Sequence, residues 1–413
     1  MLSQFTVKNY KSIRDEMTLD MQAAAISEHE NRIIKVIDKK NAELLEMFLP
    51  VAVIYGPNGG GKSNVLEALH TLEAKVLRPV CAACPEENCG YKVRKIPVKP
   101  FLFSEKTKNE PTEFELFFRT DIAEYRYILH IKEEDVVYER LDRVRFETAR
   151  RSALFERDGD FIELKGAFSK IKISEEISET LPLLSYLGIM YKKNPVILDI
   201  FTWFEHEIDF LNYGNPLQEL RTAIAKSDDL KQLILNMIKE MNLDIEDFRV
   251  EEKETDLEVY MKHNVDGYVE EINLSDESSG TQKIFGLLPF IAKSLVFGTT
   301  LVIDELDAKL HPLLLRYVIE LYTNPISNKK GGQLIFTSHD LSTMNSEVFR
   351  RDEIWFVAKG AQQNSKLYSL VEFKNKNGES VRKDAKFDKQ YLEGKYGADP
   401  YLKKIIDWSD INA

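Results

Sequence analysis

Short apolar runs alternate with polar segments along the chain, and glycines, acidic residues or a serine and a histidine follow three of the runs. The runs read "VAVIY" at residues 51–55, "TTLVI" at residues 299–303 and "QLIFT" at residues 333–337. Apolar runs of this length, bounded by turn residues, are typical of strands. After the first run, leucines at positions 66, 69 and 72 recur at helical spacing. The pattern there predicts a strand, a loop and a helix.

Residues 113–164 have a different pattern, in which apolar and polar residues alternate. The clearest pieces are "EFELFF", "EYRYILHI" and "DVVYERLDRVRF". A period of two indicates strands with one buried face, and several such strands in succession predict an antiparallel sheet.

Residues 175–245 carry helical patterns instead, and the clearest helix has Ser227 as its expected cap. Its apolar face consists of Leu230, Leu233, Ile234, Met237, Ile238 and Met241. Helix-breaking residues interrupt the segment at Pro182, Pro195, Gly214 and Pro216. These breaks exclude a long coiled coil, so we expect a short helical arm or lid suited to docking a partner.

The composition is that of a soluble globular protein, with room for two domains or for one domain with an insertion. The chain has 413 residues, of which 43% are hydrophobic and 30% are charged. Its longest apolar stretch contains Lys293 and ends in Asp304, so we expect no membrane span. The start lacks the apolar core of a signal peptide, and three cysteines do not suggest a disulfide scaffold. We therefore expect a cytoplasmic protein.

The first loop, Gly56–Ser63, has the composition of a phosphate-binding loop. In "GPNGGGKS" the glycines let successive backbone N–H groups point inward at phosphate oxygens, and the following helix adds its positive end. Lys62 is expected to reach the terminal phosphates and to be catalytic, and Ser63 to bind magnesium. The candidate nucleotide-binding residues are Gly56, Asn58, Gly59, Gly60, Gly61, Lys62, Ser63 and Asn64.

Two later segments supply the groups that phosphoryl transfer needs. The run at residues 299–303 ends in Asp304, a second candidate magnesium ligand, and Glu305, which suits polarising an attacking water. The run at residues 333–337 delivers His339, a candidate sensor of the γ-phosphate and a third catalytic residue.

A second anion site is predicted where Ser278, Ser279 and Gly280 precede a helix that runs toward Phe297. One nucleotide does not need two such sites in one chain, so we expect this one to serve the nucleotide of another subunit. The alternative is an ordinary helix cap, because serine favours that position.

Two clusters leave alternatives open. Cys81, Cys84 and Cys89, with His70, could close a tetrahedral zinc site or be reduced thiols in a loop. Residues 140–151 contain five arginines, which form either a solvated hairpin or a contact for phosphates or an acidic partner. The net charge of −12 argues against broad adhesion to nucleic acid but leaves a local basic groove open.

Taken together, these motifs resemble those of ABC-type ATPases of the SMC/RecF-like class, and more narrowly the bacterial AAA-family ATP-binding proteins of the abortive-infection AbiL/RloA type. The resembling segments are "FTVKNYKSI", "GPNGGGKSN", "SSGTQ", "IDELDAKLHP", "FTSHD" and "YLEGKYGADP". The resemblance implies a head-to-head dimer with two ATP molecules sandwiched between the loop of one chain and the signature of the other. It also implies that Asp307 crosses the interface and that His339 is the switch histidine.

The sequence departs from the pattern of this class at two points. No glutamine occurs between Ser63 and Gln218, so the residue that usually touches magnesium has no candidate at its expected place. The signature has Ser279 before Gly280 where the commonest form has two glycines.

We therefore expect an α/β fold, namely an ABC-type P-loop ATPase head with an antiparallel β lateral sheet and a short helical insertion. The expected boundaries are residues 1–172 for the first part of the head, 173–249 for the helical insertion and 250–413 for the second part of the head.

The expected function is that of an ATPase that uses ATP and Mg²⁺ and forms a homodimer or higher oligomer on ATP. It would sense or control an effector, expected to be a nuclease, in bacterial anti-phage defence. No paired-carboxylate motif follows His339, so we expect the effector to be a separate protein. The alternatives are a RecF-like repair ATPase that clamps DNA directly and an assembly scaffold that hydrolyses ATP slowly.

Overall fold

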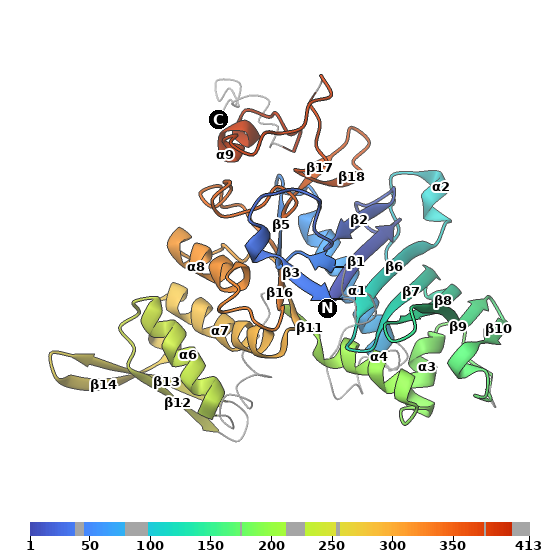
Figure 1. Ribbon diagram of the computed structural model, residues 1–413, viewed down its shortest axis with the longest axis horizontal. Coiled ribbons are helices and arrows are strands. Elements are labelled where there is room, and N and C mark those ends of the chain that lie inside the picture. Colours follow the sequence, from blue (N-terminus) through green and yellow to red (C-terminus); the bar gives the residue numbers. More distant parts are fainter. Residues whose placement is uncertain are drawn as a thin grey trace, which may run out of the picture.

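The computed structural model describes residues 1–37, 45–78, 98–173, 176–211, 228–252, 257–375 and 377–398. Two large sheets make up most of this part of the chain, and helix α1 (Lys62–Leu77) lies between them (Figure 1). A smaller sheet projects from the side of the molecule that carries helices α6 (Asp228–Glu240) and α7 (Ser279–Phe297).

The core sheet has six strands in the order β11-β15-β16-β5-β17-β18. The first five are parallel to their neighbours, and β18 pairs antiparallel with β17. The strands are β5 (Val51–Tyr55), β11 (Ile208–Leu211), β15 (Thr300–Ile303), β16 (Gln333–Thr337), β17 (Ile354–Lys359) and β18 (Ser365–Ser369).

Strand β5 is buried along its whole length because helices cover both faces of the sheet. Ala52 and Ile54 belong to the hydrophobic core that α1 shares with the second sheet. Val51, Val53 and Tyr55 belong to the core formed with α6, α7 and α8 (Pro312–Thr323). This double burial explains the uninterrupted apolar run in the sequence.

The second, lateral sheet is antiparallel, with the order β10-β9-β8-β7-β6-β1-β2. Its strands are β1 (Leu2–Lys8), β2 (Met17–Asp20), β6 (Thr112–Arg119), β7 (Ala123–Lys132), β8 (Asp135–Arg145), β9 (Arg150–Asp158) and β10 (Phe161–Leu164). The antiparallel sheet predicted over residues 113–164 is therefore confirmed. The two N-terminal strands extend it beyond that range.

The described parts of the segment expected to be helical contain three helices and one strand. The helices are α3 (Leu183–Met190), α4 (Pro195–His206) and α6. Pro182 directly precedes α3 and Pro195 is the first residue of α4, where a missing N–H costs nothing. The expectation of helix was wrong at β11, whose four residues are too few for periodicity to separate a strand from a helix. Ser227, Gly214 and Pro216 lie outside the described residues, and the predicted domain boundaries stay a prediction.

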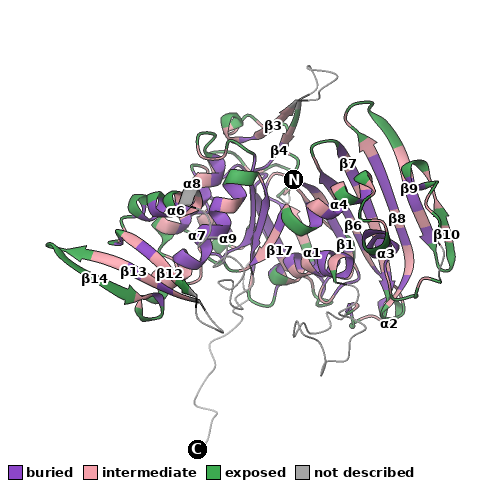
Figure 2. Ribbon diagram, turned by 90° about the horizontal axis from the view of Figure 1, so that it is seen from below, coloured by how far each residue is buried: buried purple, intermediate pink, exposed green. Residues whose placement is uncertain are grey.

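The smaller sheet has the order β12-β13-β14 and packs on α6 and α7. Its strands are β12 (Asp247–Glu252), β13 (Leu257–Val265) and β14 (Tyr268–Asn273). The exposed outer strand stands clear of the body of the molecule (Figure 2). The remaining elements of the described residues are β3 (Ile34–Ile37), β4 (Leu45–Phe48), α2 (Glu105–Lys108), α9 (Phe387–Leu392) and three 3-10 turns at Glu30–Arg32, Gly166–Phe168 and Leu274–Asp276.

None of the helices in the described part of the chain combines the length and the apolar character needed to cross a bilayer.

Candidate active site

Three loops meet at the carboxyl edge of the core sheet. Gly56–Ser63 follows β5, the carboxylates Asp304 and Glu305 follow β15, and His339 follows β16. Because β15, β16 and β5 are neighbouring parallel strands, their carboxyl ends lie side by side. This edge is where ligands bind in open α/β sheets, so the strand order brings together residues from three distant parts of the sequence.

Two glycines of the phosphate-binding loop are required by close backbone packing. A Cβ at Gly56 would clash with the carbonyl oxygen of Val357 on β17. Gly61 has a φ of 108° and a Cβ there would clash with the hydroxyls of Ser12 and Ser365. The loop can therefore curl against its neighbours only without side chains at these two positions.

Lys62 lies inside the loop that it is predicted to serve. Its ammonium donates hydrogen bonds to the carbonyl oxygens of Gly56, at 2.9 Å, and Pro57, at 3.3 Å. Burial lowers the pKa of Lys62, while the negative charges of Asp304 and Glu305 oppose that shift. The ammonium is thus held against the backbone of the loop.

A chain of hydrogen bonds fastens the loop to the turn after β1 and to strand β18. The Asn64 amide donates to the Ser12 hydroxyl at 2.7 Å, the Ser12 and Ser365 hydroxyls are 2.7 Å apart, and Ser365 Oγ is 2.6 Å from the Gly60 carbonyl oxygen. An amide N–H only donates and a carbonyl only accepts, and each hydroxyl has one proton. The direction is therefore fixed from Asn64 through Ser12 and Ser365 to Gly60. We call this set the Ser12–Ser365 bridge.

The side-chain amide of Asn64 donates to Ser12 in the bridge, and the expected role of Asn64 in nucleotide binding stays a prediction. Ser12 and Ser365 were missed as site residues. Ser12 lies within the segment "NYKSI", which the resemblance already included, whereas "QNSKLYS" around Ser365 carries no motif.

The carboxylates are held by the neighbouring strand β16. The Thr337 hydroxyl donates to Asp304 Oδ1 at 2.6 Å and accepts from the backbone N–H of Glu305 at 2.7 Å. Glu305 has a φ of 51°, in the left-handed region that residues other than glycine rarely adopt. Strained backbone of this kind is typical of functional sites. It leaves the side chain of Glu305 exposed at the edge of the sheet.

His339 is exposed beside the same edge, and its backbone is held by the loop that follows Glu305. Its N–H donates to Asp307 Oδ2 at 3.1 Å. The other oxygen, Asp307 Oδ1, is buried and has no hydrogen-bond partner among the described residues. A hydrogen bond therefore links the backbone of His339 to the loop that carries the carboxylates.

The signature serine acts as a helix cap within this chain. Ser278 Oγ accepts from the backbone N–H of Thr281 at 3.1 Å and lies 2.9 Å from its hydroxyl. Ser278 and Ser279 are exposed, and no hydrogen bond or ion pair joins Ser278, Ser279 or Gly280 to the phosphate-binding loop. The capping alternative thus describes the single chain, and a role toward a second chain stays a prediction.

Lys283 ties the signature helix to the catalytic loop. Its ammonium donates to the backbone carbonyls of Glu305, at 3.0 Å, and Ala308, at 2.6 Å. Burial lowers the pKa of Lys283 to about 8. The position of α7 is therefore coupled to that of the backbone that carries Glu305.

The donors present fit a magnesium nucleotide. The exposed Ser63 hydroxyl and the Asp304 carboxylate are oxygen ligands of the kind that Mg²⁺ prefers. No group of three metal-ligating side chains occurs in the described ranges, and Cys81, Cys84 and Cys89 lie outside them, so zinc gains no support. The His70 ring, named with them, stacks on Phe210 at 4.7 Å, and burial lowers its pKa.

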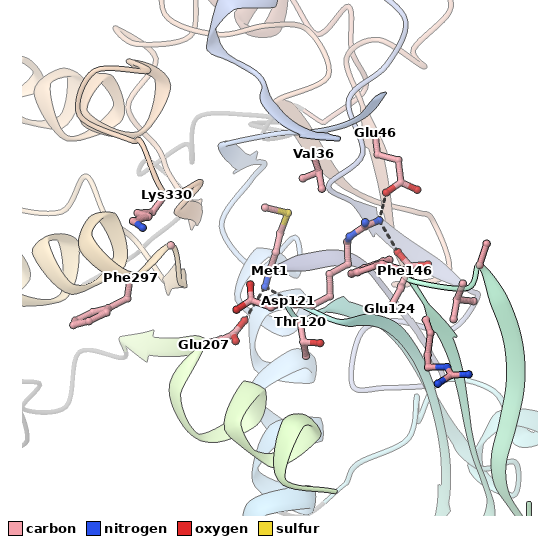
Figure 3. A pocket seen from close by; sticks show the side chains of 15 residues that line it. Met1, Val36, Glu46, Thr120, Asp121, Glu124, Phe146, Glu207, Phe297 and Lys330 are labelled. Atoms are coloured by element: carbon pink, nitrogen blue, oxygen red, sulfur yellow. Dashed lines mark hydrogen bonds and ion pairs between the residues drawn. The ribbon is translucent and has the colours of Figure 1, made fainter. Parts of the chain in front are cut away.

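A cavity of about 490 Å³ lies elsewhere, at the amino ends of the core strands (Figure 3). Glu207 precedes β11 and Lys330 precedes β16, and both line it. Its Arg119 is already paired with Glu46 and with Glu124. The cavity is therefore separate from the candidate active site, which is an open edge of the sheet.

A glycine loop, a carboxylate pair and a histidine on neighbouring parallel strands, beside an antiparallel lateral sheet, define a P-loop ATPase head of the ABC type. Residues 51–345 match the family model described as "AAA domain, putative AbiEii toxin, Type IV TA system". The chain belongs to this family, which confirms the resemblance drawn from its motifs.

Among solved structures, the chain is similar to an SMC head bound to the C-winged helix domain of ScpA. The two are 14% identical, the match covers 89% of this chain and 97% of that one, and the TM-score is 0.45. The SMC head domain from Thermotoga maritima is also 14% identical, with 89% and 98% covered and a TM-score of 0.41. No curated protein matches the sequence.

Proposed function

We propose that this protein binds and hydrolyses Mg·ATP at the carboxyl edge of its core sheet. The observation that carries the proposal is the convergence of Lys62, Asp304 and Glu305 at one edge of the sheet, because β5, β16 and β15 are adjacent and parallel. Phosphoryl transfer depends mainly on positioning and charge stabilisation, and these groups supply both.

Each residue has a distinct part in this proposal. Lys62 neutralises charge on the terminal phosphates, Ser63 and Asp304 hold the metal, and Glu305 polarises the attacking water. His339 senses the γ-phosphate. Mg²⁺, when bound, neutralises charge that develops on the phosphate oxygens. The bond from Thr337 to Asp304 restricts rotation of that carboxylate before ligand binds.

The proposed active form is a homodimer in which the signature of one chain completes the ATP site of the other. The exposure of Ser278 and Ser279 at the start of a long helix supports this arrangement, since a helix N-terminus attracts anions. The coupling of Lys283 to Glu305 gives a route by which contact at the signature shifts the catalytic backbone.

The proposed biological role is control of a separate effector, such as a nuclease, in bacterial anti-phage defence in the cytoplasm. The family description names a putative toxin of a toxin–antitoxin system, which fits a protein whose activity must be held in check. Direct clamping on DNA is less favoured, because the net charge is −12 and Arg140 of the arginine cluster is bonded to Asp142 and Glu156.

ATP binding and turnover of three variants test the catalytic part. Lys62→Ala should lose ATP binding. Glu305→Gln should keep binding but lose turnover by about 100-fold or more, the usual contribution of a general base. Glu320→Gln, on the exposed face of α8, is the matched control and should behave as wild type. Turnover of Glu305→Gln within a few fold of wild type would exclude Glu305 as the catalytic carboxylate.

A further inference from the structure

The outer strand of the smaller sheet has a free edge. Strand β14 pairs with β13 alone among the described strands, so its second row of backbone groups has no ladder partner. Five of its six residues are exposed. Free strand edges are templates for pairing with another chain, and natural proteins usually blunt them.

The base of this sheet is firmly attached to the body of the protein. The Phe248 ring packs edge-on against Phe285 of α7, with 5.0 Å between the ring centroids, and Val259 and Met261 of β13 are buried. The outer part therefore projects from a fixed base, as the views in Figures 1 and 2 show.

The projecting part is unusually apolar for an exposed hairpin. Tyr268 is 82% exposed, Val265 64% and Val269 49%. Tyr268 lies opposite Val265 in the strand pairing, while Val269 belongs to the other face of the hairpin. Exposed apolar groups gathered at one place are typical of interaction sites.

The same edge carries unbalanced negative charge. Asp266 in the turn and Glu270 on β14 are exposed and form no ion pair with any residue that the structure describes. The basic side chains of the sheet already have acidic partners: Arg249 contacts Glu271, Lys262 contacts Glu246 and His263 contacts Glu277. A partner must therefore bring its own positive charge.

A second copy of this chain is disfavoured at the edge when all six residues of β14 pair. In that register, antiparallel pairing of β14 with itself about a two-fold axis would place Glu270 of one copy opposite Glu271 of the other. Like charges directly opposite each other destabilise a strand pair.

We propose that β14 is a docking edge for an extended, basic segment of a partner protein, which joins the sheet as a fourth strand. On the face that carries Tyr268 and Glu270, lysine or arginine side chains would lie against Glu270, near Asp266, with their aliphatic stems over Tyr268. On the other face, apolar side chains would cover Val269. Backbone pairing gives affinity in such complexes, and alternating side chains give specificity.

This edge lies next to the signature. His263 on β13 is 2.6 Å from the Glu277 carboxylate, and Glu277 directly precedes the cap residue Ser278. In the strand pairing His263 lies opposite Glu270 of β14, so β14 is linked to the start of α7 through its neighbour β13. The docking proposal itself does not depend on ATP hydrolysis.

Binding of labelled peptides to the full chain, measured by fluorescence anisotropy without nucleotide, tests the proposal. A peptide of alternating lysine and valine should bind. A glutamate–valine peptide should bind at least tenfold more weakly, and so should a peptide with the same lysines but prolines in place of valines, because proline prevents strand pairing. Equal binding of the proline peptide would mean that overall charge alone attracts the lysines, and this would overturn the proposal.

Variants of exposed residues locate the site. Asp266→Lys with Glu270→Lys, and Tyr268→Ala with Val269→Ser, should each weaken binding of the lysine–valine peptide about tenfold. Asp160→Lys with Phe161→Ala makes matched changes at the turn and start of β10, the edge strand of the lateral sheet, where Phe161 is 64% exposed. This control should bind as wild type, and an equal loss there would contradict the assignment to β14.

Two further measurements make every outcome decisive. Photo-crosslinking of the peptide to the wild-type chain should mark β14, and marks confined to other segments would overturn the proposal without any variant. Sedimentation should show either no self-association of the wild-type chain or self-association that persists in Tyr268→Ala. If Tyr268→Ala abolishes self-association, the edge is an interface between copies and the partner proposal is wrong.

Discussion

The shape of the phosphate-binding loop should depend on one hydroxyl, that of Ser365 on β18. In the Ser12–Ser365 bridge, the Ser365 hydroxyl donates to the Gly60 carbonyl and accepts from Ser12. Ser365→Ala removes both bonds. A buried hydrogen bond contributes about 1 kcal/mol net, so the total loss is about 2 kcal/mol. This corresponds to about 30-fold in an equilibrium constant.

We expect most of this lost free energy to appear as weaker ATP binding rather than as lower stability of the fold. Loop glycines have no side chains to hold the loop in shape, so the loop should relax once the bridge is cut, and ATP binding must then restore its shape. ATP affinity, measured by isothermal titration calorimetry, should fall by about ten- to thirtyfold. The thermal unfolding temperature without nucleotide should change by only a few degrees.

Ser369→Ala is the matched control for this prediction. Ser369 is on the same strand and equally buried, but its hydroxyl has no hydrogen-bond partner within the described part of the chain. Its removal should leave ATP affinity unchanged. The double variant Ser12→Ala with Ser365→Ala should lose less than the sum of the single losses, because the two serines share one bond. Affinity of Ser365→Ala within twofold of wild type, or strict additivity, would refute the reasoning.

Two other predictions concern the signature helix. If chains complete each other's sites, a mixture of Ser278→Arg and Lys62→Ala should regain about a quarter of wild-type ATP turnover, since random pairing leaves one intact site in each mixed dimer. Each parent alone should be inactive. The variant Ser278→Ala should show how much of the lost turnover is due to loss of the helix cap. If pull-down shows mixed dimers and mixing still gives no gain in turnover, the signature does not act across chains. Burial lowers the pKa of Lys283 to about 8, so the unfolded chain holds this proton to higher pH than the folded chain does. The free energy of unfolding of wild type relative to Lys283→Met should therefore rise between about pH 8 and 10.5, and a flat difference in chemical denaturation would show that the pKa of Lys283 is not lowered.

Local sequence patterns predicted the centre of the fold well because both faces of that sheet are buried. The run at residues 51–55 coincides with β5, and the runs before Asp304 and His339 contain β15 and β16. The helix expected near Asn64 begins at Lys62. A strand that is buried on both faces appears in the sequence as an uninterrupted apolar run and is therefore easy to predict.

The patterns failed where a strand is short and joins a sheet built from distant residues. Strand β11 lies within the segment whose sequence pattern predicts helices, yet it pairs with β15 at the edge of the core sheet. Strands β1 and β2 join a lateral sheet whose other strands begin at Thr112. Pairing partners so far apart in sequence leave no periodic signal in a window of a few residues.

The candidate site divides in the same way. Its glycines, Lys62 and the carboxylates are recognisable because their chemistry requires fixed spacing within one short segment. The bridge that holds them has no such spacing, since Ser12 and Ser365 are 353 positions apart.

This separation has a physical consequence for how the site forms. The Gly60 carbonyl finds its hydrogen-bond partner on β18, and Ser365 in turn pairs by its backbone N–H with Ser12 in the turn after β1. Bringing such distant residues together costs chain entropy, and this cost is offset only when the surrounding strands have paired and packed. The loop sequence alone therefore does not make the binding site. The phosphate-binding loop reaches its shape only when the first and last strands of the head have met across it.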